Sequence, residues 1–299
     1  MRGRTKLTVL IACLAALFLS GCAGMLDAGP HVPALTSGRM LVTTDWLERN
    51  LDATDTVIVH VAEERDGYDG SHIPGAQFVH WEDIAVTRNG VPNELPPMEQ
   101  LTQLVRRLGI DEKTWVVAYD EEGGLMAARF YVAMDYLGLG ERTMLLDGQL
   151  PVWQTEDRPL TDEEPTVGTS DYAPGLSGNV LATLRTVRDA SRAATRLEEA
   201  PISMVDARPE AEYTGADPGK EIERAGHIPG AAGIFWERNL VSMERPMMKP
   251  VSELLTLYRE AGIEPGDLVI TYCRTGGQAS HAYFTAKYLG YETRIYDGS

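Results

Sequence analysis

The residue best suited to chemistry is Cys273, which opens the segment Cys273-Arg274-Thr275-Gly276-Gly277-Gln278-Ala279-Ser280. It directly follows the apolar run Leu268 to Tyr272, which is typical of a buried strand, and a helix pattern begins at Gln278. A tight glycine-containing loop between strand and helix can turn its backbone N–H groups inward around one atom, and the helix dipole adds positive potential there. We therefore expect a catalytic nucleophile whose pKa lies below the free value of ~8.5.

The neighbours of Cys273 are suited to holding a persulfide or a bound oxyanion. Gly276 and Gly277 let the backbone approach closely because they carry no Cβ. The polar residues expected to contact a substrate are Arg274, Thr275, Gln278 and Ser280, beside the two glycines. The alternative is a buried, inert cysteine, which requires none of these features. The pattern favours catalysis.

Cysteines in such loops have two well-known uses, and one of them lacks a required residue here. Cysteine phosphatases need the pattern Cys-x5-Arg, in which the arginine grips phosphate through two hydrogen bonds. That position is Ala279, and the residue before the cysteine, often histidine in those enzymes, is Tyr272. Sulfur chemistry is therefore favoured over phosphate chemistry.

The N-terminus predicts export and lipid attachment. The first residues include three basic ones, Arg2, Arg4 and Lys6. An apolar stretch from Leu7 to Leu19 follows them, and it is too short to span a bilayer. The stretch ends in Leu19-Ser20-Gly21-Cys22, which resembles a bacterial lipobox. Cleavage would then remove residues 1–21 and leave a lipid on Cys22. An ordinary secretory signal with a chance cysteine is the alternative.

Processing at Cys22 decides where the protein resides and which thiols remain. Cys13 leaves with the signal and Cys22 carries lipid, so Cys273 is expected to be the one free thiol and no internal disulfide can form. Ala23 is not an inner-membrane retention signal of the Asp type, so the outer membrane is favoured if the organism has two membranes.

The formal charge of −17 argues against nucleic acid as a partner, because phosphate binding requires basic patches.

The chain contains a duplication. His72-Ile73-Pro74-Gly75-Ala76 recurs as His227-Ile228-Pro229-Gly230-Ala231, and Val116-Val117-Ala118-Tyr119-Asp120 is answered by Val269-Ile270-Thr271-Tyr272-Cys273. Nearly constant offsets over this length indicate two copies of one domain. The expected parts are a tether over 22–37, a first domain over 38–155, a linker over 156–178 and a second domain over 179–299.

Each copy alternates short apolar strands with helical segments, which predicts an α/β fold with a mostly parallel sheet covered on both faces. In the second copy the expected strands are 203–207, 268–272 and 293–296, and the expected helices are 251–261 and 278–289. In such sheets reactive groups lie beyond the carboxyl ends of strands. Cys273 has that position.

The motifs of both copies, in this order and spacing, resemble the tandem-domain rhodanese family from about residue 38 to the end. They are Asp206-Ala207-Arg208, Glu212-Tyr213-Thr214-Gly215, Gly226 to Ala231, the Cys273 loop and Tyr296-Asp297-Gly298-Ser299, with Ala127-Ala128-Arg129, Leu146-Asp147-Gly148 and Trp153 in the first copy. The resemblance implies two tandem rhodanese-like domains, each a mostly parallel five-stranded sheet flanked by helices on both faces. It also implies an inactive first domain, in agreement with Asp120 at the place of Cys273, because a carboxylate cannot accept a sulfane sulfur. His60 stands where the second copy has Asp206. The first copy should be scaffold and one wall of the cleft.

The resemblance further implies a sulfurtransferase that works by double displacement through a Cys273 persulfide, without metal or organic cofactor. Arg208 is expected to clamp an anionic donor, the alternative being a salt bridge with Asp206 or Glu212. Cys273-Arg274-Thr275-Gly276 fits thiosulfate enzymes, although a basic residue is common where Thr275 stands. A 3-mercaptopyruvate enzyme, or a persulfide carrier without turnover, are the alternatives. The expected acceptor is cyanide or a thiol, a thioredoxin-like protein being one candidate for the thiol, and the expected state is a monomer.

The remaining candidates have structural roles in this interpretation. His281 could transfer protons but is expected to have a surface or packing role. His72 and His227 are expected to hydrogen-bond the backbone of their loops. The tryptophans are expected in the core or between the domains; they are Trp46, Trp81, Trp115, Trp153 and Trp236. No spacing of His, Cys or acidic residues predicts a metal site.

Overall fold

The computed structural model describes residues 40–88, 90–196, 201–217, 219 and 224–298. These residues belong to one compact unit. The predicted signal peptide, Cys22 and the tether lie outside the described residues. No helix within the described part of the chain is long and apolar enough to cross a membrane.

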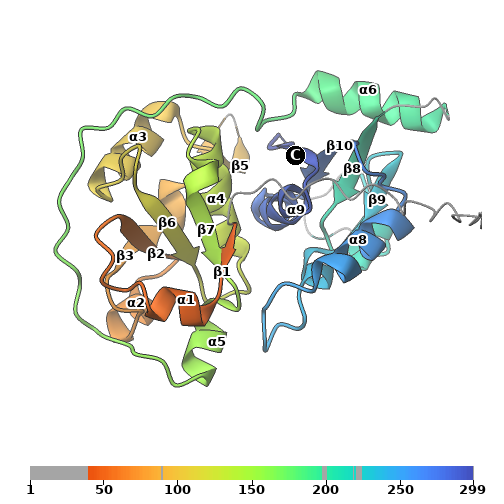
Figure 1. The fold of residues 1–299 in the computed structure, drawn as a ribbon. Helices are drawn as coiled ribbons and strands as arrows, with labels where there is room; N and C mark the ends of the chain where they lie inside the picture. The colour runs from red at the N-terminus through yellow and green to blue at the C-terminus, as the bar shows by residue number, and fades with distance from the viewer. Residues whose placement is uncertain (1–39, 89, 197–200, 218, 220–223, 299) are drawn as a thin grey trace, which may run out of the picture. The chain divides into compact units, whose positions relative to one another are not determined.

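The first domain contains a parallel sheet of five strands in the order β1-β7-β6-β2-β3 (Figure 1). The strands are β1 (Leu41–Val42), β2 (Thr56–Ala62), β3 (Ala76–His80), β6 (Trp115–Tyr119) and β7 (Thr143–Leu146). The helices are α1 (Thr44–Glu48), α2 (Asp66–Gly70), α3 (Met98–Arg107), α4 (Leu125–Tyr136) and α5 (Gln149–Thr155), with single turns η1 (Trp81–Asp83) and η2 (Gly140–Arg142).

Strand β6 shows why this sheet is covered on both faces. Val116 and Ala118 belong to one apolar cluster, while Val117 and Tyr119 belong to another. Successive side chains of a strand point to opposite faces, so both faces of the sheet carry a core. A continuous apolar run, rather than an alternating one, is the sequence pattern of such a strand.

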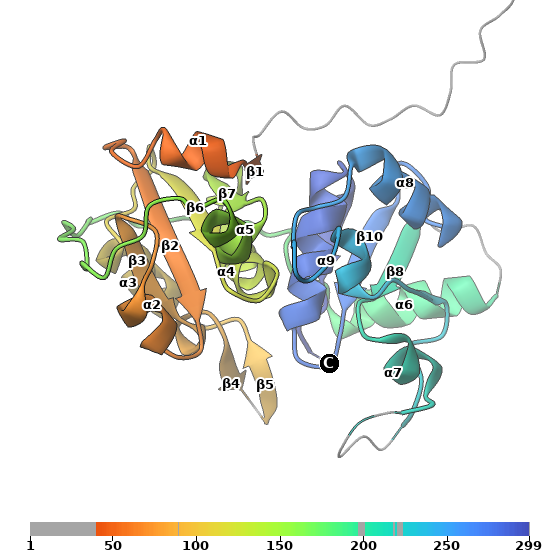
Figure 2. The same ribbon diagram turned by 90° about the horizontal axis from the view of Figure 1, so that it is seen from below.

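A two-stranded antiparallel hairpin extends from the first domain (Figure 2). It is made of β4 (Val86–Arg88) and β5 (Val91–Glu94). Asn93 on β5 has a left-handed backbone with φ of 58°, and its side-chain oxygen accepts a hydrogen bond from the indole N–H of Trp81 at 3.3 Å. The hairpin was not foreseen from the sequence, yet it brings Asn93 into the site described below.

The second domain repeats this arrangement with one strand fewer. Its parallel sheet has the order β11-β10-β8-β9, with β8 (Ile202–Asp206), β9 (Ala231–Gly233), β10 (Leu268–Tyr272) and β11 (Glu292–Ile295). Where the first domain has β1, the second has a single parallel bridge between Leu181 and Ile295. The expected fifth strand is thus reduced to one paired residue. The helices are α6 (Leu184–Thr195), α7 (Glu210–Thr214), α8 (Val251–Glu260) and α9 (Gly277–Tyr288), with the turn η3 (Trp236–Asn239).

The expected elements of the second domain are confirmed. Strand β10 has the predicted bounds, and the other expected strands and helices differ from theirs by one residue, at one end in α8 and at both ends in β8, β11 and α9. Helix α9 begins at Gly277 because Gly276, with φ of +83°, turns the chain out of the strand in a conformation that favours glycine. Between α5 and α6, residues 156–183 form no helix or strand apart from the isolated bridges at Thr161 and Leu181. The domain limits themselves stay a prediction.

The helices that follow the two equivalent strands, α4 and α9, pack against each other. Tyr131 meets Phe284 edge-on with ring centroids 5.0 Å apart, and the hydroxyl of Tyr283 donates to Asp135 at 2.6 Å. Both helices are buried nearly all round. Because the loops bearing Asp120 and Cys273 lead directly into these helices, the packing brings residues of the first domain close to Cys273.

Candidate active site

Cys273 lies at the carboxyl end of β10 with its thiol enclosed. The residue is 2% exposed, and the N–H of Gly276 donates to its Sγ at 3.0 Å. The sulfur therefore lies inside the loop that leads into α9, as the sequence predicts. A nucleophile at this depth is largely shielded from solvent.

Gly276 is confined on the side facing the first domain. A Cβ built on it would lie 3.1 Å from Asp297 Oδ1, 3.2 Å from Arg129 Nη1 and 3.3 Å from the carbonyl oxygen of Asn93. Its positive φ is also one that residues with a Cβ rarely adopt. Both facts require glycine at the position whose N–H holds the sulfur.

The pKa of the Cys273 thiol is raised, which corrects the sequence-based expectation of a lowered value. Complete burial is the largest cause, because it penalises the charged thiolate; backbone N–H groups of Ala279, Thr275 and Gly276 and the charge of Arg129 oppose it. The loop has the predicted stabilising groups. In the resting protein they do not outweigh the loss of water around the sulfur.

Alkylation should reveal this raised pKa. The rate of Cys273 modification by iodoacetamide is expected to keep rising above pH 9, because only the thiolate reacts. Quantifying the peptide that contains Cys273 by mass spectrometry over pH 6 to 10.5 gives the profile, with free N-acetylcysteine as the reference. A plateau reached below pH 8 would contradict the prediction.

The other predicted loop residues divide into two groups. Arg274, Thr275, Gly277 and Gln278 line a cavity of about 230 Å³ at the mouth of the loop. Ser280 does not: its hydroxyl is buried and donates to the carbonyl of Gly276 at 2.8 Å, within the first turn of α9. Ser280 therefore supports the loop from behind.

The opposite wall of this cavity comes from the first domain, as expected for the non-catalytic copy. Its apolar and amide surface is formed by Trp81, Asn93, Leu125 and Met126. Three carboxylates also line the cavity. Glu63 and Glu122 of the first domain were not predicted to do so, and Glu212 of the second domain was predicted only as a motif residue and a candidate partner of Arg208. Arg274 is the one cation among the lining residues, and no ion pair of its guanidinium exists within the described residues. An anion entering this mouth thus meets a free arginine inside a negatively charged rim.

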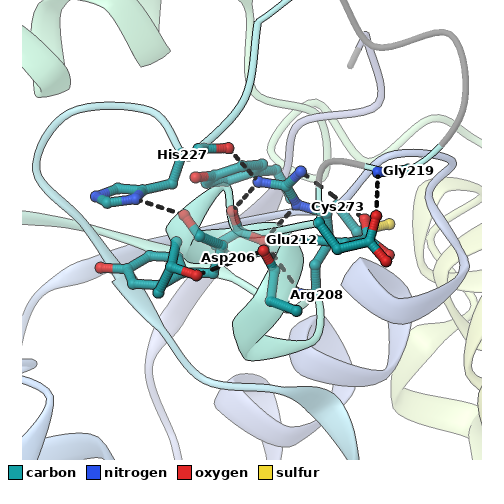
Figure 3. A network of polar contacts seen from close by, with 12 residues as sticks. Asp206, Arg208, Glu212, Gly219, His227 and Cys273 are labelled. Atoms are coloured by element: carbon teal, nitrogen blue, oxygen red, sulfur yellow. Dashed lines mark hydrogen bonds and ion pairs between the residues drawn. The ribbon is translucent and has the colours of Figure 1, made fainter.

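Arg208 is held in the salt bridge that the sequence left open as the alternative to an anion clamp (Figure 3). Its Nε donates to Asp206 Oδ1 at 2.9 Å and its Nη2 to Asp206 Oδ2 at 2.6 Å. Nη2 also donates to the carbonyl of Gly226 at 2.8 Å, while Nη1 is 3.9 Å from Glu212. The pair joins the end of β8 to the Gly226 turn. Arg208 lines a separate cavity of about 330 Å³ together with Tyr213, Phe235 and Arg238.

The histidines have the packing roles predicted for them. His72 Nδ1 lies 2.7 Å from the carbonyl of Tyr68, and His227 Nδ1 lies 2.9 Å from that of Tyr213. His281 is buried against Trp236, with ring centroids 5.1 Å apart, and burial lowers its pKa to about 4. A histidine that stays neutral in the core has no surface role, and it does not reach the sulfur by any contact in the structure.

The loop of the first domain that begins at Asp120 is equivalent to the Cys273 loop, and it surrounds an anionic group. Both carboxylate oxygens of Asp120 accept backbone N–H bonds, at 2.8 to 2.9 Å, from Glu122, Gly124, Met126 and Ala127. Burial raises the pKa of Asp120 to about 6 while these four bonds oppose the shift. By the duplication, Glu122 and Met126 correspond to Thr275 and Ala279 of the second loop. The first domain therefore carries a built-in anion where the second carries sulfur.

No group of three or more potential metal ligands exists among the residues that the structure describes. The loop instead offers N–H donors, which bind anionic sulfur or oxygen. The arrangement can therefore hold a thiolate, a persulfide or the oxygens of a small oxyanion.

Known proteins share this architecture. The family model described as a rhodanese-like domain matches residues 43–156 and 189–299. A "Putative thiosulfate sulfurtransferase" of Mycobacterium leprae is 31% identical over 87% of this chain and 92% of its own length, and the "Sulfur carrier protein TtuD" of Thermus thermophilus is 32% identical with the same coverage. The crystal structure of SseA from Escherichia coli, described under 3-mercaptopyruvate sulfotransferases, superposes with a TM-score of 0.75 at 25% identity, covering 87% of this chain and 98% of that one.

Proposed function

This chain belongs to the rhodanese family and is a sulfurtransferase, and we propose that it takes its sulfur from thiosulfate and passes it on through a persulfide at Cys273. The observation that carries the proposal is the duplicated loop. One copy surrounds the carboxylate of Asp120 with four N–H groups, and the other encloses Cys273 at the equivalent position. A sulfur that must alternate between thiolate and persulfide anion requires such a site.

The reaction consists of two displacements at sulfur. The Cys273 thiolate attacks the sulfane sulfur of thiosulfate; a sulfur–sulfur bond forms, the bond to the sulfonyl sulfur breaks, and sulfite departs with the electron pair. An acceptor nucleophile, cyanide or a thiolate, then attacks the outer sulfur of the persulfide and leaves the Cys273 thiolate behind. The Gly276 N–H, which bonds Sγ at 3.0 Å, stabilises the negative charge of the thiolate that attacks the donor and that leaves in the second displacement.

Arg274 supports thiosulfate as the donor, because the segment Cys273-Arg274-Thr275-Gly276 resembles the loop of thiosulfate enzymes. It is exposed at the mouth of the cavity, and no ion pair with another described residue competes with the sulfonate oxygens for its guanidinium. A charge-assisted hydrogen bond contributes about 1.5–3 kcal/mol, or roughly 10- to 100-fold in affinity. The relative from Mycobacterium leprae, described above, is named for the same donor.

Replacing Arg274 with alanine should lower kcat/KM for thiosulfate by about 10- to 100-fold, mainly through KM. Steady-state assays with thiosulfate and with 3-mercaptopyruvate, cyanide being the acceptor in both, measure the effect. Arg185→Ala on α6 is the matched control, because that arginine is solvent-exposed and lines none of the cavity. Higher kcat/KM with 3-mercaptopyruvate in the unaltered protein would overturn the thiosulfate assignment.

A persulfide carrier is the second candidate function, and the enclosure of Cys273 favours it. A thiol only 2% exposed protects a bound sulfur until a partner opens the mouth. The relative from Thermus thermophilus is named a sulfur carrier. A stable gain of one sulfur on Cys273 without turnover to cyanide would support the carrier. Transfer to a thioredoxin-like protein would then identify the acceptor class.

We also propose that the protein is exported and anchored by a lipid on Cys22, acting as a monomer at the cell envelope. The support is the sequence pattern of residues 2–22. Replacing Cys22 with serine, or adding globomycin, should leave the unprocessed precursor, visible as a larger mass on a gel. Normal processing of the serine variant would show that the anchor is absent.

A further inference from the structure

The non-catalytic domain places a buried arginine behind the Cys273 loop. Arg129 on α4 is 0% exposed, and its Nη1 and Nη2 donate to Asp297 Oδ1 and Oδ2 at 2.9 and 3.2 Å. Nη2 also donates to the carbonyl of Asn93 at 2.5 Å, while Nε has no partner within the described residues. A full positive charge is thus fixed at the junction of two domains that are joined by α4 and α9.

This charge lies against the residue that holds the sulfur. A Cβ built on Gly276 would be 3.2 Å from Arg129 Nη1 and 3.1 Å from Asp297 Oδ1, so both groups lie beside Gly276 on the side where other residues carry a side chain. The N–H of the same residue donates to Cys273 Sγ. Asp297 is itself held by the N–H of Leu95 at 2.6 Å. Arg129 of the first domain and Asp297 of the second therefore surround the residue whose N–H group bonds the sulfur.

We propose that Arg129 is a positioning residue that the first domain supplies to the sulfur chemistry of the second: it lies beside the residue whose amide bonds Cys273, and its charge, tempered by Asp297, stabilises the thiolate and the persulfide. The inference deepens the proposed function and rests on it for the persulfide. It also gives the first domain a role in the reaction, although that domain has Asp120 in place of a nucleophilic cysteine. Sulfur loading in the second domain would then require the first.

Electrostatics supports the direction of this effect. The charge of Arg129 lowers the pKa of Cys273 against the larger, opposing effect of burial. Asp297, 10% exposed at its side chain, partly neutralises that charge. Removing Arg129 should therefore raise the pKa of the Cys273 thiol, and neutralising Asp297 should lower it. A purely mechanical role of the pair would shift this pKa in the same direction in both variants.

The experiment measures the pH profile of Cys273 alkylation by iodoacetamide in the full chain, read from the peptide that contains Cys273. Arg129→Met should raise the apparent pKa, so that the rate at pH 7.5 falls by roughly 2- to 10-fold. Arg129→Lys keeps the charge and should recover most of that rate. Asp297→Asn should lower the apparent pKa and raise the rate.

Lys287→Met is the matched control. Lys287 pairs with Asp135 at the same contact between α4 and α9, but it touches neither Gly276 nor Cys273. Its loss should weaken the domain contact and leave the alkylation profile unchanged. Equal shifts in Lys287→Met and Arg129→Met, or shifts of the same sign in Arg129→Met and Asp297→Asn, would overturn the proposal. Because alkylation needs no sulfur donor, these outcomes stay separate from a failure of thiosulfate turnover.

Discussion

Cys273→Ala is expected to abolish sulfur transfer, lowering kcat with thiosulfate and cyanide by at least about 10³-fold, as expected when a covalent nucleophile is removed. No other group can replace it. The equivalent residue of the first domain is Asp120, which cannot form a persulfide, and Cys273 is the free cysteine among the described residues. The thiocyanate colour assay measures the rate.

The fold should survive this change. The side chain is buried but small, and truncation to alanine at such a position costs about 1 kcal/mol. Cys273→Ser is the companion variant, since it retains an acceptor for the Gly276 N–H but not the nucleophilicity of sulfur. Intact mass after incubation with thiosulfate should gain one sulfur in the unaltered protein and none in either variant. Residual turnover of a tenth or more in either variant would assign the chemistry to another residue.

The parts of the site that the sequence could predict are those set by local chain direction. The apolar run ending at Tyr272 and the glycines after it determine a strand, a turn and a helix, so the position of Cys273 followed directly. The duplication then made Asp120 the comparison for it. These features depend on residues within about ten positions of each other.

The parts that could not be predicted arise from contacts between distant residues. Arg129 and Asp297 are 168 positions apart and meet because α4 packs on α9. The pKa of Cys273 was predicted in the wrong direction for the same reason: the N–H groups are local, whereas the burial that outweighs them comes from the surrounding fold. A short fifth strand was likewise expected where tertiary packing leaves only the Leu181 bridge.

Asp206→Ala is expected to lower the free energy of unfolding by about 3–5 kcal/mol, because it leaves the guanidinium of Arg208 buried without its partner. Arg208 is 9% exposed, and Asp206 takes two of its hydrogen bonds in fork geometry. Glu212 at 3.9 Å and the Gly226 carbonyl remain, but neither replaces a bidentate carboxylate. Urea unfolding followed by far-UV circular dichroism measures the loss.

The double variant Asp206→Leu/Arg208→Met separates structure from substrate binding at this pair. Replacing both charges with apolar groups of similar volume should recover most of the stability lost by Asp206→Ala, since no buried charge is left uncompensated. Because both Nε and Nη2 of Arg208 are already committed to Asp206, we expect KM for thiosulfate to change by less than about tenfold, within the contribution of one charge-assisted hydrogen bond. A stable double variant whose KM for thiosulfate rises much more than tenfold would contradict this expectation. It would mean that thiosulfate draws Arg208 away from Asp206 during the reaction. The anion clamp predicted from the sequence would then form only when the donor binds.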